Sequence, residues 1–527
     1  MSPRVLIADK LSPLAQKVFD DRGVETDLKV GLDKDQLAEI IGNYNGLAVR
    51  SATKVTEKVL GQTNGRLRVI GRAGIGVDNI DVPAATAKGI IVMNTPFGNS
   101  ITTAEHAITM MMALARQIPE ADRSTQAGKW EKSKFMGVEV TAKTLGVIGC
   151  GNIGSIVANR GRGLAMKVIA FDPFLTPERA SELGVEKVEL DDLFRRADFI
   201  TLHTPLTDKT KNIISAAAIS KMKKGVRIIN CARGGLIAEA ALADAMRTGH
   251  VAGAALDVFE TEPASENPLF GLPNVICTPH LGASTTEAQE NVAVQVAEQM
   301  ADYLLNGAIS NAVNFPSISA EEAPRLQPFI KLAEQLGSFA GQLTETGLKR
   351  IRIEYAGEMS DMNTKALTSA ALTGVLRPLL QDINMVSAPS IARHRGIMVE
   401  EVRRDQEGAY ETYMRVGVTS ERQSRSVAGT VFSDNRPRLI QIHGMNLEAE
   451  VTPNMLYTEN ADKPGYIGAI GTVLGEAGVN IATFTLGRET FGGTAIALLG
   501  VDETISDGVL AKVSSLPNVK RASRLRF

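Results

Sequence analysis

The chain has 527 residues, which is enough for about three or four domains of the usual size. Its 57 basic and 59 acidic residues nearly balance, so no nucleic-acid or membrane surface is indicated. The three cysteines form no CxxC pair, which argues against a disulfide framework or a structural zinc site. The chain starts directly with a strand-like segment and contains no apolar stretch of 18 residues. We therefore expect a soluble cytoplasmic protein with no bound metal, no nucleic-acid partner and no membrane anchor.

Short apolar runs alternate with helical patterns over the first 280 residues, which indicates βα units on parallel sheets. A first series of strands is predicted at residues 5–8, 47–49, 67–70 and 90–92. A second series is predicted at residues 145–149, 168–172, 199–202, 226–231, 252–256 and 275–277. Two such series predict two Rossmann-like α/β lobes with a small-ligand cleft between them.

Two long helices are predicted beside these strands, at residues 99–118 and 284–306. The first is expected to turn one apolar side toward the core, with Ile101, Ile108, Met111, Met112 and Ala115.

The pattern changes after residue 317, where a helix at 324–344 and strands at 349–355, 410–418, 428–432 and 438–443 predict an α+β unit. The end of the chain shows the βαββαβ order of a ferredoxin-like fold, at 454–459, 465–477, 479–487, 493–501, 505–514 and 519–525. We predict four parts: a first lobe at 1–98 completed by 284–315, a dinucleotide-binding lobe at 99–283, an α+β domain at 317–452 and a ferredoxin-like domain at 453–527.

A glycine-rich turn, GCGNIG at residues 149–154, follows an apolar run and predicts a dinucleotide site. Gly149 would turn the chain, Gly151 would let the backbone approach a pyrophosphate, and Gly154 would let the next helix pack against the strand. That helix begins around Asn152 and Ile153, where free N–H groups can bind phosphate.

An acidic residue, Asp172, follows the glycine turn at a distance of 18 positions. Its carboxylate can accept hydrogen bonds from a ribose diol, and it repels the 2′-phosphate of NADP. Pro173 and Phe174 place no arginine directly beside it, and Arg179 is the cation that could reverse the preference. The expected cofactor is therefore NAD.

Three predicted strand ends carry charged residues, and the carboxyl ends of such strands are where doubly wound sheets bind ligands. Arg233, Glu262 and His280 each follow one strand of the second series. Taken singly, each has an ordinary explanation: a surface ion pair, a solvated loop acid and a turn histidine. Their convergence beside a nicotinamide site instead indicates oxidation of a 2-hydroxy acid.

The chemistry assigns a role to each of the three residues. His280 can take the hydroxyl proton as hydride leaves, since histidine titrates near neutral pH. A carboxylate beside it, here Glu262, would favour the protonated imidazole. Arg233 can hold the substrate carboxylate through two parallel hydrogen bonds.

Four motifs together resemble the D-2-hydroxyacid dehydrogenases: GCGNIG with Asp172, NCARGG at 230–235, ALDVFETEP at 255–263 and TPHLGAST at 278–285. RSAT at 50–53, GRAGIGVDNID at 71–81 and NTP at 94–96 resemble the members of that family that act on 3-phosphoglycerate. The resemblance implies NAD-dependent oxidation of 3-phospho-D-glycerate to 3-phosphohydroxypyruvate, the first step of L-serine synthesis. It also implies that His280 is the acid/base, Glu262 its partner and Arg233 the carboxylate anchor.

The same resemblance implies further site residues. It places the substrate phosphate on Arg50, Ser51 and Arg72, where arginine forks suit phosphate. It places the backbone of Ala73 and Gly74 on the substrate carboxylate. Cofactor contacts are implied at Thr204, Pro205, Ala232, Asp257 and Gly282, beside Arg233 and His280.

The segment 128–134 departs from the family pattern. Relatives can supply an arginine from here to the neighbouring subunit's phosphate site, whereas this chain offers only Lys132 and Lys134. Lysine is a less directional phosphate partner, so that contact stays open. Trp130 is interpreted as a dimer-contact or core residue.

The final unit resembles an ACT domain, through DKPGYIG at 462–468 and GVNI at 478–481. This implies L-serine as a feedback effector at Asn460, Asp462 and Asn480, and pairing of ACT domains within a homotetramer. Local capping of a loop and helix is the alternative role of these three residues. The segment 317–452 resembles the intervening domain of the long form of the family, and no chemistry is assigned to it.

Two alternatives to this function stay open. The first uses the same mechanism on an unphosphorylated acid such as glycerate or lactate, and Arg50 and Arg72 would separate the two. The second is a non-catalytic NAD-sensing protein on the same scaffold, which the complete Arg/Glu/His set does not favour.

Overall fold

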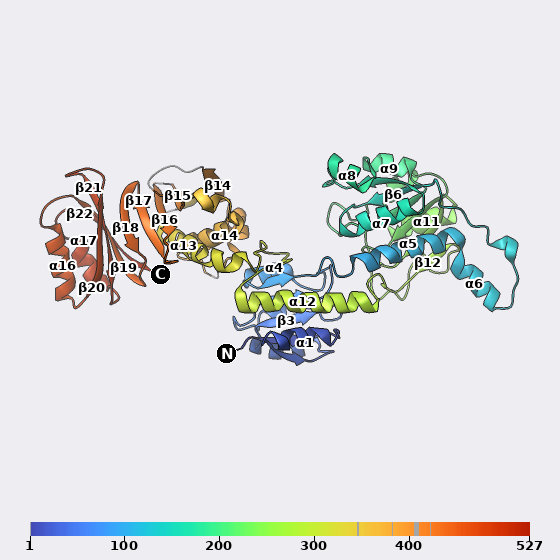
Figure 1. Cartoon of the computed structure of the whole chain (residues 1–527), viewed down its shortest axis with the longest axis horizontal. Helices are drawn as coiled ribbons and strands as arrows, with labels where there is room; N and C mark the ends of the chain where they lie inside the picture. The colour runs from blue at the N-terminus through green and yellow to red at the C-terminus, as the bar shows by residue number, and fades with distance from the viewer. Residues whose placement is uncertain (1, 345–346, 382, 405–409, 422) are drawn as a thin grey trace.

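The computed structural model describes residues 2–344, 347–381, 383–404, 410–421 and 423–527. Figure 1 shows a first lobe at the bottom, a second lobe at the upper right and the C-terminal half at the left. Within the described ranges, no helix is both long enough and apolar enough to span a membrane.

The first lobe is a five-stranded parallel sheet with helices on its faces. Its strands are β1 (Arg4–Ile7), β2 (Glu25–Leu28), β3 (Gly46–Val49), β4 (Val69–Arg72) and β5 (Ile91–Met93), in the order β2-β1-β3-β4-β5. Its helices are α1 (Leu14–Asp21), α2 (Lys34–Ile40), α3 (Glu57–Leu60), α4 (Val82–Ala87) and the short η1 (Ile41–Asn43). The four predicted strands are present, whereas β2 was not predicted because none of its side chains is buried.

A helix from much later in the chain completes this lobe. The helix α12 (Thr286–Asn306) returns from the second lobe and covers the sheet (Figure 1). A Cβ added at Gly71 would lie 2.2 Å from Met300 Sδ and 2.6 Å from a methyl of Val296. The glycine therefore lets α12 pack directly on β4.

The second lobe is a seven-stranded parallel sheet. Its strands are β6 (Thr144–Ile148), β7 (Lys167–Phe171), β8 (Glu186–Lys187), β9 (Phe199–Leu202), β10 (Val226–Asn230), β11 (Val251–Leu256) and β12 (Val275–Cys277). They lie in the order β12-β11-β10-β9-β6-β7-β8. The chain order reverses beside β6, and such a switch point is where sheets of this kind bind ligands.

Helices surround this sheet, and one of them differs from its predicted orientation. They are α5 (Ser100–Arg116), α6 (Ile118–Gln126), η2 (Lys132–Lys134), α7 (Asn152–Gly163), α8 (Pro177–Leu183), α9 (Leu190–Arg196), α10 (Ala216–Ser220) and α11 (Glu239–Arg247). In α5, Met111 and Ala115 are buried as predicted, but Ile101 is 57% exposed and Met110 and Leu114 are buried instead. The prediction followed the largest side chains, whereas α5 buries a face rich in alanine.

The C-terminal half contains two further sheets. The first consists of β13 (Leu348–Ala356), β14 (Met398–Arg404), β15 (Tyr413–Ser420), β16 (Ser424–Val431), β17 (Pro437–Ile442) and β18 (Met445–Glu450), in the order β14-β13-β15-β16-β17-β18. Its helices are α13 (Glu322–Gln342), α14 (Thr364–Leu376), α15 (Ala388–His394) and the short η3 (Gly357–Ser360). The outer strands β14 and β18 were not predicted.

The last sheet is antiparallel and has the βαββαβ order that the sequence predicts. Its elements are β19 (Asn454–Ala461), α16 (Tyr466–Glu476), β20 (Ile481–Arg488), β21 (Thr494–Val501), α17 (Asp507–Ser514) and β22 (Val519–Arg526), with the strand order β20-β21-β19-β22. This arrangement confirms the ferredoxin-like prediction.

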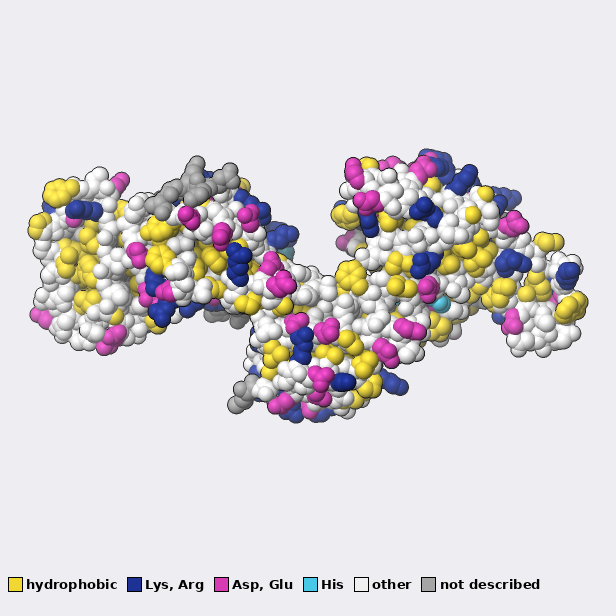
Figure 2. Space-filling model, viewed as in Figure 1, with side chains coloured by type: hydrophobic (Ala, Val, Ile, Leu, Met, Phe, Trp, Pro, Cys, Tyr) yellow, Lys and Arg dark blue, Asp and Glu magenta, His cyan; other side chains and the backbone are white. Residues whose placement is uncertain are grey.

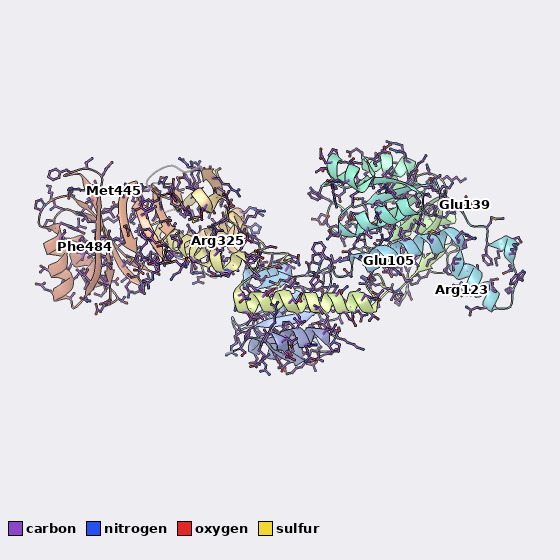
Figure 3. All side chains as sticks on the ribbon, viewed as in Figure 1. Glu105, Arg123, Glu139, Arg325, Met445 and Phe484 are labelled. Atoms are coloured by element: carbon purple, nitrogen blue, oxygen red, sulfur yellow. The ribbon has the colours of Figure 1, made fainter. Side chains whose placement is uncertain are left out.

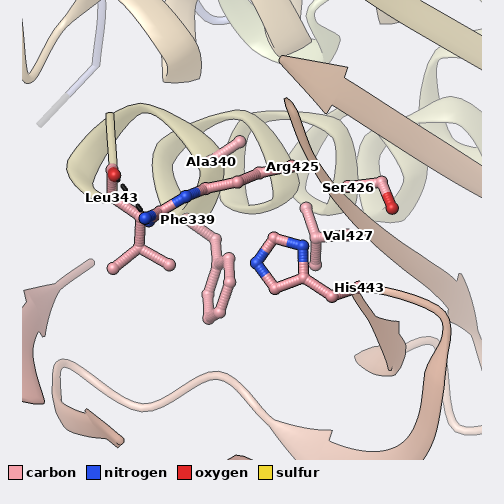
Figure 4. A pocket seen from close by; sticks show the side chains of 7 residues that line it. All are labelled: Phe339, Ala340, Leu343, Arg425, Ser426, Val427 and His443. Atoms are coloured by element: carbon pink, nitrogen blue, oxygen red, sulfur yellow. Dashed lines mark hydrogen bonds between the residues drawn. The ribbon is translucent and has the colours of Figure 1, made fainter. Parts of the chain in front are cut away.

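The helix α13 joins the two C-terminal sheets. The ring of Phe339 contacts the ring of Tyr457 edge-on, with 5.8 Å between centroids. Beside it, Arg425 Nη1 donates to the carbonyl of Leu343 at 2.6 Å, and the ring of His443 faces the same small hollow (Figure 4). Burial lowers the pKa of His443, so the imidazole contributes to this junction as a neutral ring.

Candidate active site

The glycine turn has the geometry that a dinucleotide loop requires. Gly149 has a φ of +88°, and an added Cβ would lie 2.6 Å from the carbonyl oxygen of His203. A Cβ at Gly154 would lie 1.9 Å from the carbonyl of Gly149, so the start of α7 packs directly on the turn. A Cβ at Gly151 would meet no atom within 4 Å, which leaves open space over the N-terminus of α7 at Asn152 and Ile153. The loop therefore fits a pyrophosphate group.

Asp172 follows β7 and is tied to the glycine turn. Its Oδ2 accepts a hydrogen bond from the amide of Cys150, and its Oδ1 accepts one from the amide of Phe174, both at 2.8 Å. Arg179 pairs with Glu182, with 2.8 Å between Nη1 and Oε2. The nearby cation is thus engaged elsewhere, and the acid keeps the position that favours NAD.

A polar atom without a partner lies on the other side of the turn. Thr204 Oγ1 is buried and makes no hydrogen bond in the described part of the chain, and Pro205 follows it. Burial lowers the pKa of His203 to about 3, so this ring is neutral. An unpartnered buried hydroxyl beside the glycine turn supports a cofactor contact at Thr204.

The loops after β11 and β12 bring His280 and Glu262 together. His280 Nδ1 donates to Glu262 Oε2 at 2.8 Å, and Glu262 Oε1 accepts from the amide of Phe259 at 3.0 Å. Burial raises the pKa of Glu262, but the hydrogen bonds from His280 and Phe259 outweigh it and hold that pKa below its usual value. The carboxylate is therefore ionised and orients the imidazole.

His280 has an uncommon backbone conformation that Asp257 supports. Its φ is +55°, in the left-handed region that residues other than glycine seldom adopt. The amide of His280 donates to the carbonyl of Asp257 at 2.9 Å. The buried Asp257 carboxylate accepts from the amides of Leu281 and Gly282, each at 2.7 Å. The loop that carries His280 is thus wrapped around one aspartate.

Asp257 also holds side chains from two other elements. Its Oδ1 accepts from Thr278 Oγ1 at 2.6 Å and lies 3.3 Å from His106 Nε2. Burial raises the pKa of Asp257, but the hydrogen bonds from His106, Thr278 and Leu281 outweigh it, and the pKa stays below its usual value. Asp257 therefore has a structural role, beside the nicotinamide contact that the resemblance implies for it.

Arg233 reaches from the second lobe to the first. Its Nε lies 3.1 Å from Asp78 Oδ2, and its Nη1 donates to the carbonyl of Ala232 at 2.7 Å. A Cβ at Gly76 would lie 1.9 Å from Nη2, so the glycine allows this close approach. Asn230 shapes the loop by accepting from the amide of Ala232 and donating to the carbonyl of Arg233.

Arg72 and Arg50 lie on the first-lobe side of the same site. The Nε of Arg72 is buried and has no hydrogen-bond partner in the described structure. Burial, together with the charges of Arg233 and Arg50, lowers the pKa of Arg72 to about 10. Ser51 is exposed beside Arg50. Arg72 thus has an unused N–H donor and lies near two other positive charges, which together suit the binding of a phosphate group.

The amides of Ala73 and Gly74 already donate within the protein, to the carbonyl of Val49 at 2.8 Å and to Thr95 Oγ1 at 2.6 Å. The implied backbone contact with the substrate carboxylate therefore finds no free N–H at these two residues. Among the described residues, the next amides along the loop, at Ile75 and Gly76, make no hydrogen bond.

Sequence reasoning missed the residues that position these groups. Asn79 donates to the carbonyls of Arg50 and Thr53, and Asn94 donates to the carbonyl of Ile75. The DN pair at 78–79 and the turn at 94–96 were recognised only as parts of a motif.

Within the described ranges, no group of three or more His, Cys, Asp or Glu side chains could hold a metal ion.

The three implied effector residues do not lie together within one chain. Asn460 is buried, with its Oδ1 unpartnered, and Asp462 accepts from Arg488 Nη1 at 3.2 Å and from the amide of Gly492 at 3.0 Å. Asn480 lies beyond the opposite end of β21, where it donates to Asp502 Oδ2 at 2.6 Å. The stretch of β21 between the Asn460 end and the Asn480 end is about 23 Å long, at about 3.3 Å per residue.

Two family models match the chain. Residues 108–282 match the NAD binding domain of D-isomer specific 2-hydroxyacid dehydrogenases. Residues 325–443 match the D-3-phosphoglycerate dehydrogenase intervening domain. The two matches cover the lobe with the glycine turn and the sheet packed on α13.

Curated relatives and a solved structure agree with these matches. D-3-phosphoglycerate dehydrogenase from Synechocystis is 43% identical, over 99% of this chain and 95% of its own length. The enzyme of that name from Bacillus subtilis is 40% identical, over 98% of each chain. A crystal structure of a glyoxylate reductase from Paecilomyes thermophila is 30% identical and covers 59% of this chain and 98% of its own, with a TM-score of 0.55. The chain therefore belongs to the D-3-phosphoglycerate dehydrogenases, within the NAD-dependent D-2-hydroxyacid dehydrogenase family.

Proposed function

We propose that His280, Glu262 and Arg233 carry out the NAD-dependent oxidation of 3-phospho-D-glycerate to 3-phosphohydroxypyruvate, the first step of L-serine biosynthesis. The observation that carries these roles is the His280–Glu262 hydrogen bond of 2.8 Å at the carboxyl edge of the second-lobe sheet. His280 takes the proton from the substrate hydroxyl, and Glu262 stabilises the imidazolium that forms. NAD, when bound, would supply the hydride acceptor for the carbon that carries this hydroxyl.

The cofactor would be held by the second lobe. The glycine turn and the start of α7 receive the pyrophosphate, and Asp172 accepts hydrogen bonds from the adenosine ribose. Thr204 and Pro205 line the adenosine side. On the nicotinamide side, Ala232, Asp257 and Gly282 complete the site.

The substrate would lie between the two lobes' loops. Its phosphate pairs with Arg50 and Arg72, with Ser51 beside them, and its carboxylate pairs with Arg233. The free amides of Ile75 and Gly76 are better donors to that carboxylate than those of Ala73 and Gly74, since the latter are already engaged. Both ends of the substrate are then fixed before proton transfer.

The test is NADH formation with 3-phosphoglycerate, D-glycerate and D-lactate in parallel. We expect a strong preference for the phosphorylated acid in the wild type. Arg72→Gln should reduce that preference by raising KM for 3-phosphoglycerate while leaving kcat/KM for D-glycerate within about threefold. A wild type equally active on D-glycerate would contradict the phosphate assignment and favour the unphosphorylated-acid alternative.

Two surfaces support self-assembly into a homotetramer. The first is an arm formed by α6 and residues 127–137, marked by Arg123 and Glu139 in Figure 3, whose Trp130 is 88% exposed and Met136 80% exposed. Trp130 is therefore not a core residue. Figure 2 shows hydrophobic side chains over this projecting end, and exposed apolar surface of this kind marks protein interfaces. Lys132 lies on the same arm and could reach a neighbouring subunit's phosphate site.

The second surface is β20, an outer strand of the ACT-like sheet that carries Phe484 (Figure 3). If two copies pair antiparallel along β20, the start of one strand lies beside the end of the other. Asn480 of one copy then approaches Asp462 of the other, because Arg488 at the end of β20 holds Asp462. The three residues separated within one chain would thus form an L-serine site between two copies.

Serine inhibition tests this second surface directly. We expect Asp462→Ala and Asn480→Ala each to abolish inhibition by L-serine without changing uninhibited turnover. Because the site needs one residue from each copy, a mixture of the two single variants should recover inhibition in part. Serine inhibition that persists in both single variants would place the effector elsewhere.

We also propose a division into four domains: a substrate-binding domain at 1–98 with 284–315, an NAD-binding domain at 99–283, an intervening domain at 317–452 and an ACT regulatory domain at 453–527. We also propose that the enzyme works in the cytoplasm. Its three free thiols, at Cys150, Cys231 and Cys277, suit a reducing compartment.

A further inference from the structure

Asp78 holds the arginine that is proposed to anchor the substrate carboxylate. It follows β4 in the first lobe, and its Oδ2 lies 3.1 Å from the Nε of Arg233 in the second lobe. The Asp78 side chain is 74% exposed, whereas that of Arg233 is 28% exposed. The aspartate therefore approaches the arginine from the solvent side.

The contact uses the edge of the guanidinium that a substrate carboxylate needs. An arginine binds a carboxylate through two parallel N–H groups of one edge. Arg233 Nη1 already donates to the carbonyl of Ala232, which leaves the Nε–Nη2 edge. Asp78 occupies Nε on that edge, while Nη2 makes no hydrogen bond within the described residues.

The backbone beside Asp78 is fixed, while its carboxylate is free to leave. Asn79 donates to the carbonyls of Arg50 and Thr53, at 2.7 and 2.6 Å, and so ties this loop to the phosphate side of the site. Apart from Arg233, the Asp78 carboxylate makes no hydrogen bond within the described ranges. The side chain can therefore rotate away without disturbing the arginines.

We propose that Asp78 occupies Arg233 as a stand-in for the substrate carboxylate, so that every ligand that binds Arg233 through a carboxylate must first displace it. This inference rests on the proposed role of Arg233. A short hydroxy acid only replaces the Asp78 carboxylate with its own at Arg233, so it gains little binding free energy there. A phosphorylated acid meets the same cost at Arg233, and its further contacts at Arg50 and Arg72 supply the binding free energy that offsets it.

The test compares ligands that differ in their anionic groups. In Asp78→Asn, kcat/KM for D-glycerate should rise about two- to fivefold, the effect of releasing an exposed ion pair. The inhibition constant of glycerol 3-phosphate, which lacks the carboxylate, should change by less than that factor. Asp20→Asn removes the same charge from the exposed face of α1 and should leave both constants unchanged.

Asp78→Glu retains the charge and should keep the wild-type kcat/KM for D-glycerate. If Asp78→Asn leaves kcat/KM for D-glycerate unchanged or lowers it, Asp78 does not act as a stand-in and the inference is overturned. Arg233→Lys distinguishes this failure from that of the proposed function. If Arg233→Lys keeps normal turnover and KM, the anchor role falls together with the inference about Asp78. If Arg233→Lys lowers turnover or raises KM while Asp78→Asn has no effect, Arg233 remains the carboxylate anchor and only the inference about Asp78 fails.

Discussion

His280 Nδ1 and Glu262 Oε2 lie 2.8 Å apart, although their loops leave two different strands of the second-lobe sheet. The pair leaves Nε2 of the imidazole for the substrate, so proton transfer depends on this one ring. Replacing His280 with Ala should lower turnover at saturating substrate by about 10²–10⁴. Steady-state kcat with 3-phosphoglycerate and NAD checks this. His394→Ala, an exposed histidine of α15, is the matched control and should behave like the wild type. A His280→Ala variant with near-normal kcat would remove His280 from the acid/base role.

Alanine substitution at two glycines of α7 should have opposite effects on stability and NAD binding: harmful at Gly154 and neutral at Gly163. At Gly154 an added methyl would lie 1.9 Å from the carbonyl oxygen of Gly149, which is backbone and cannot move aside cheaply. Gly154→Ala should therefore destabilise the lobe by about 1–3 kcal/mol and raise KM for NAD. At Gly163, the last residue of the same helix, a methyl would meet no atom within 4 Å. Thermal unfolding and NAD titration of both variants check this, and equal behaviour of the two would contradict it.

The two arginines of the first lobe should act on the phosphate and not on the chemistry. Arg50→Gln combined with Arg72→Gln is expected to raise KM for 3-phosphoglycerate at least tenfold, since hydrogen bonds to charged groups contribute about 1.5–3 kcal/mol each. Saturating kcat should fall much less, because His280 and Glu262 are unchanged. Arg66→Gln, at an exposed position of the same lobe, provides the control. A loss confined to kcat would show that these arginines act on the reacting carbon instead.

Acid should weaken the loop around Asp257 in a defined direction. The pKa of Asp257 is lower in the folded protein than its ordinary value of about 4. Its stabilisation is therefore fully present above that ordinary value and is lost as the pH falls through the lower folded-state value.

Asp257→Asn should accordingly destabilise the second lobe at pH 7, by about 1–3 kcal/mol, and the difference from the wild type should shrink with acidification toward and below pH 4. Melting temperatures of both proteins across this pH range measure the effect. A difference that grows toward low pH would contradict the assignment.

The sequence predicted the strands that are buried along most of their length and missed several strands at the ends of their sheets. β6 and β10 are almost wholly buried, so their apolar runs were recognised. β2, β14 and β18 lie at the ends of their sheets. β2 and β14 have no fully buried side chain, and β18 buries only Leu447 and Ala449, so each has too weak an apolar pattern to identify a strand.

The candidate site shows the same limit. Arg233, Glu262 and His280 stand in recognisable motifs at predicted strand ends, so the sequence alone could propose them as site residues. The contacts of Asp78 and His106 could not be predicted, because each joins elements far apart in the chain: Asp78 to Arg233, and His106 to Asp257. Likewise, only the folded chain reveals that the amide of Gly74 is already used by Thr95.

The return of α12 to the first lobe affects the order in which the protein can fold during synthesis. The core of the first sheet contains Val5 and Val69 together with Val296 and Met300 of α12. The core that α5 and α7 build with the second-lobe sheet is complete by Ile276. The second lobe can therefore complete its core first, although it is synthesised later. The N-terminal sheet keeps one face uncovered until residue 300 has left the ribosome. Nascent chains that stop before α12 should expose that face to chaperones, although every strand of the sheet has already been synthesised.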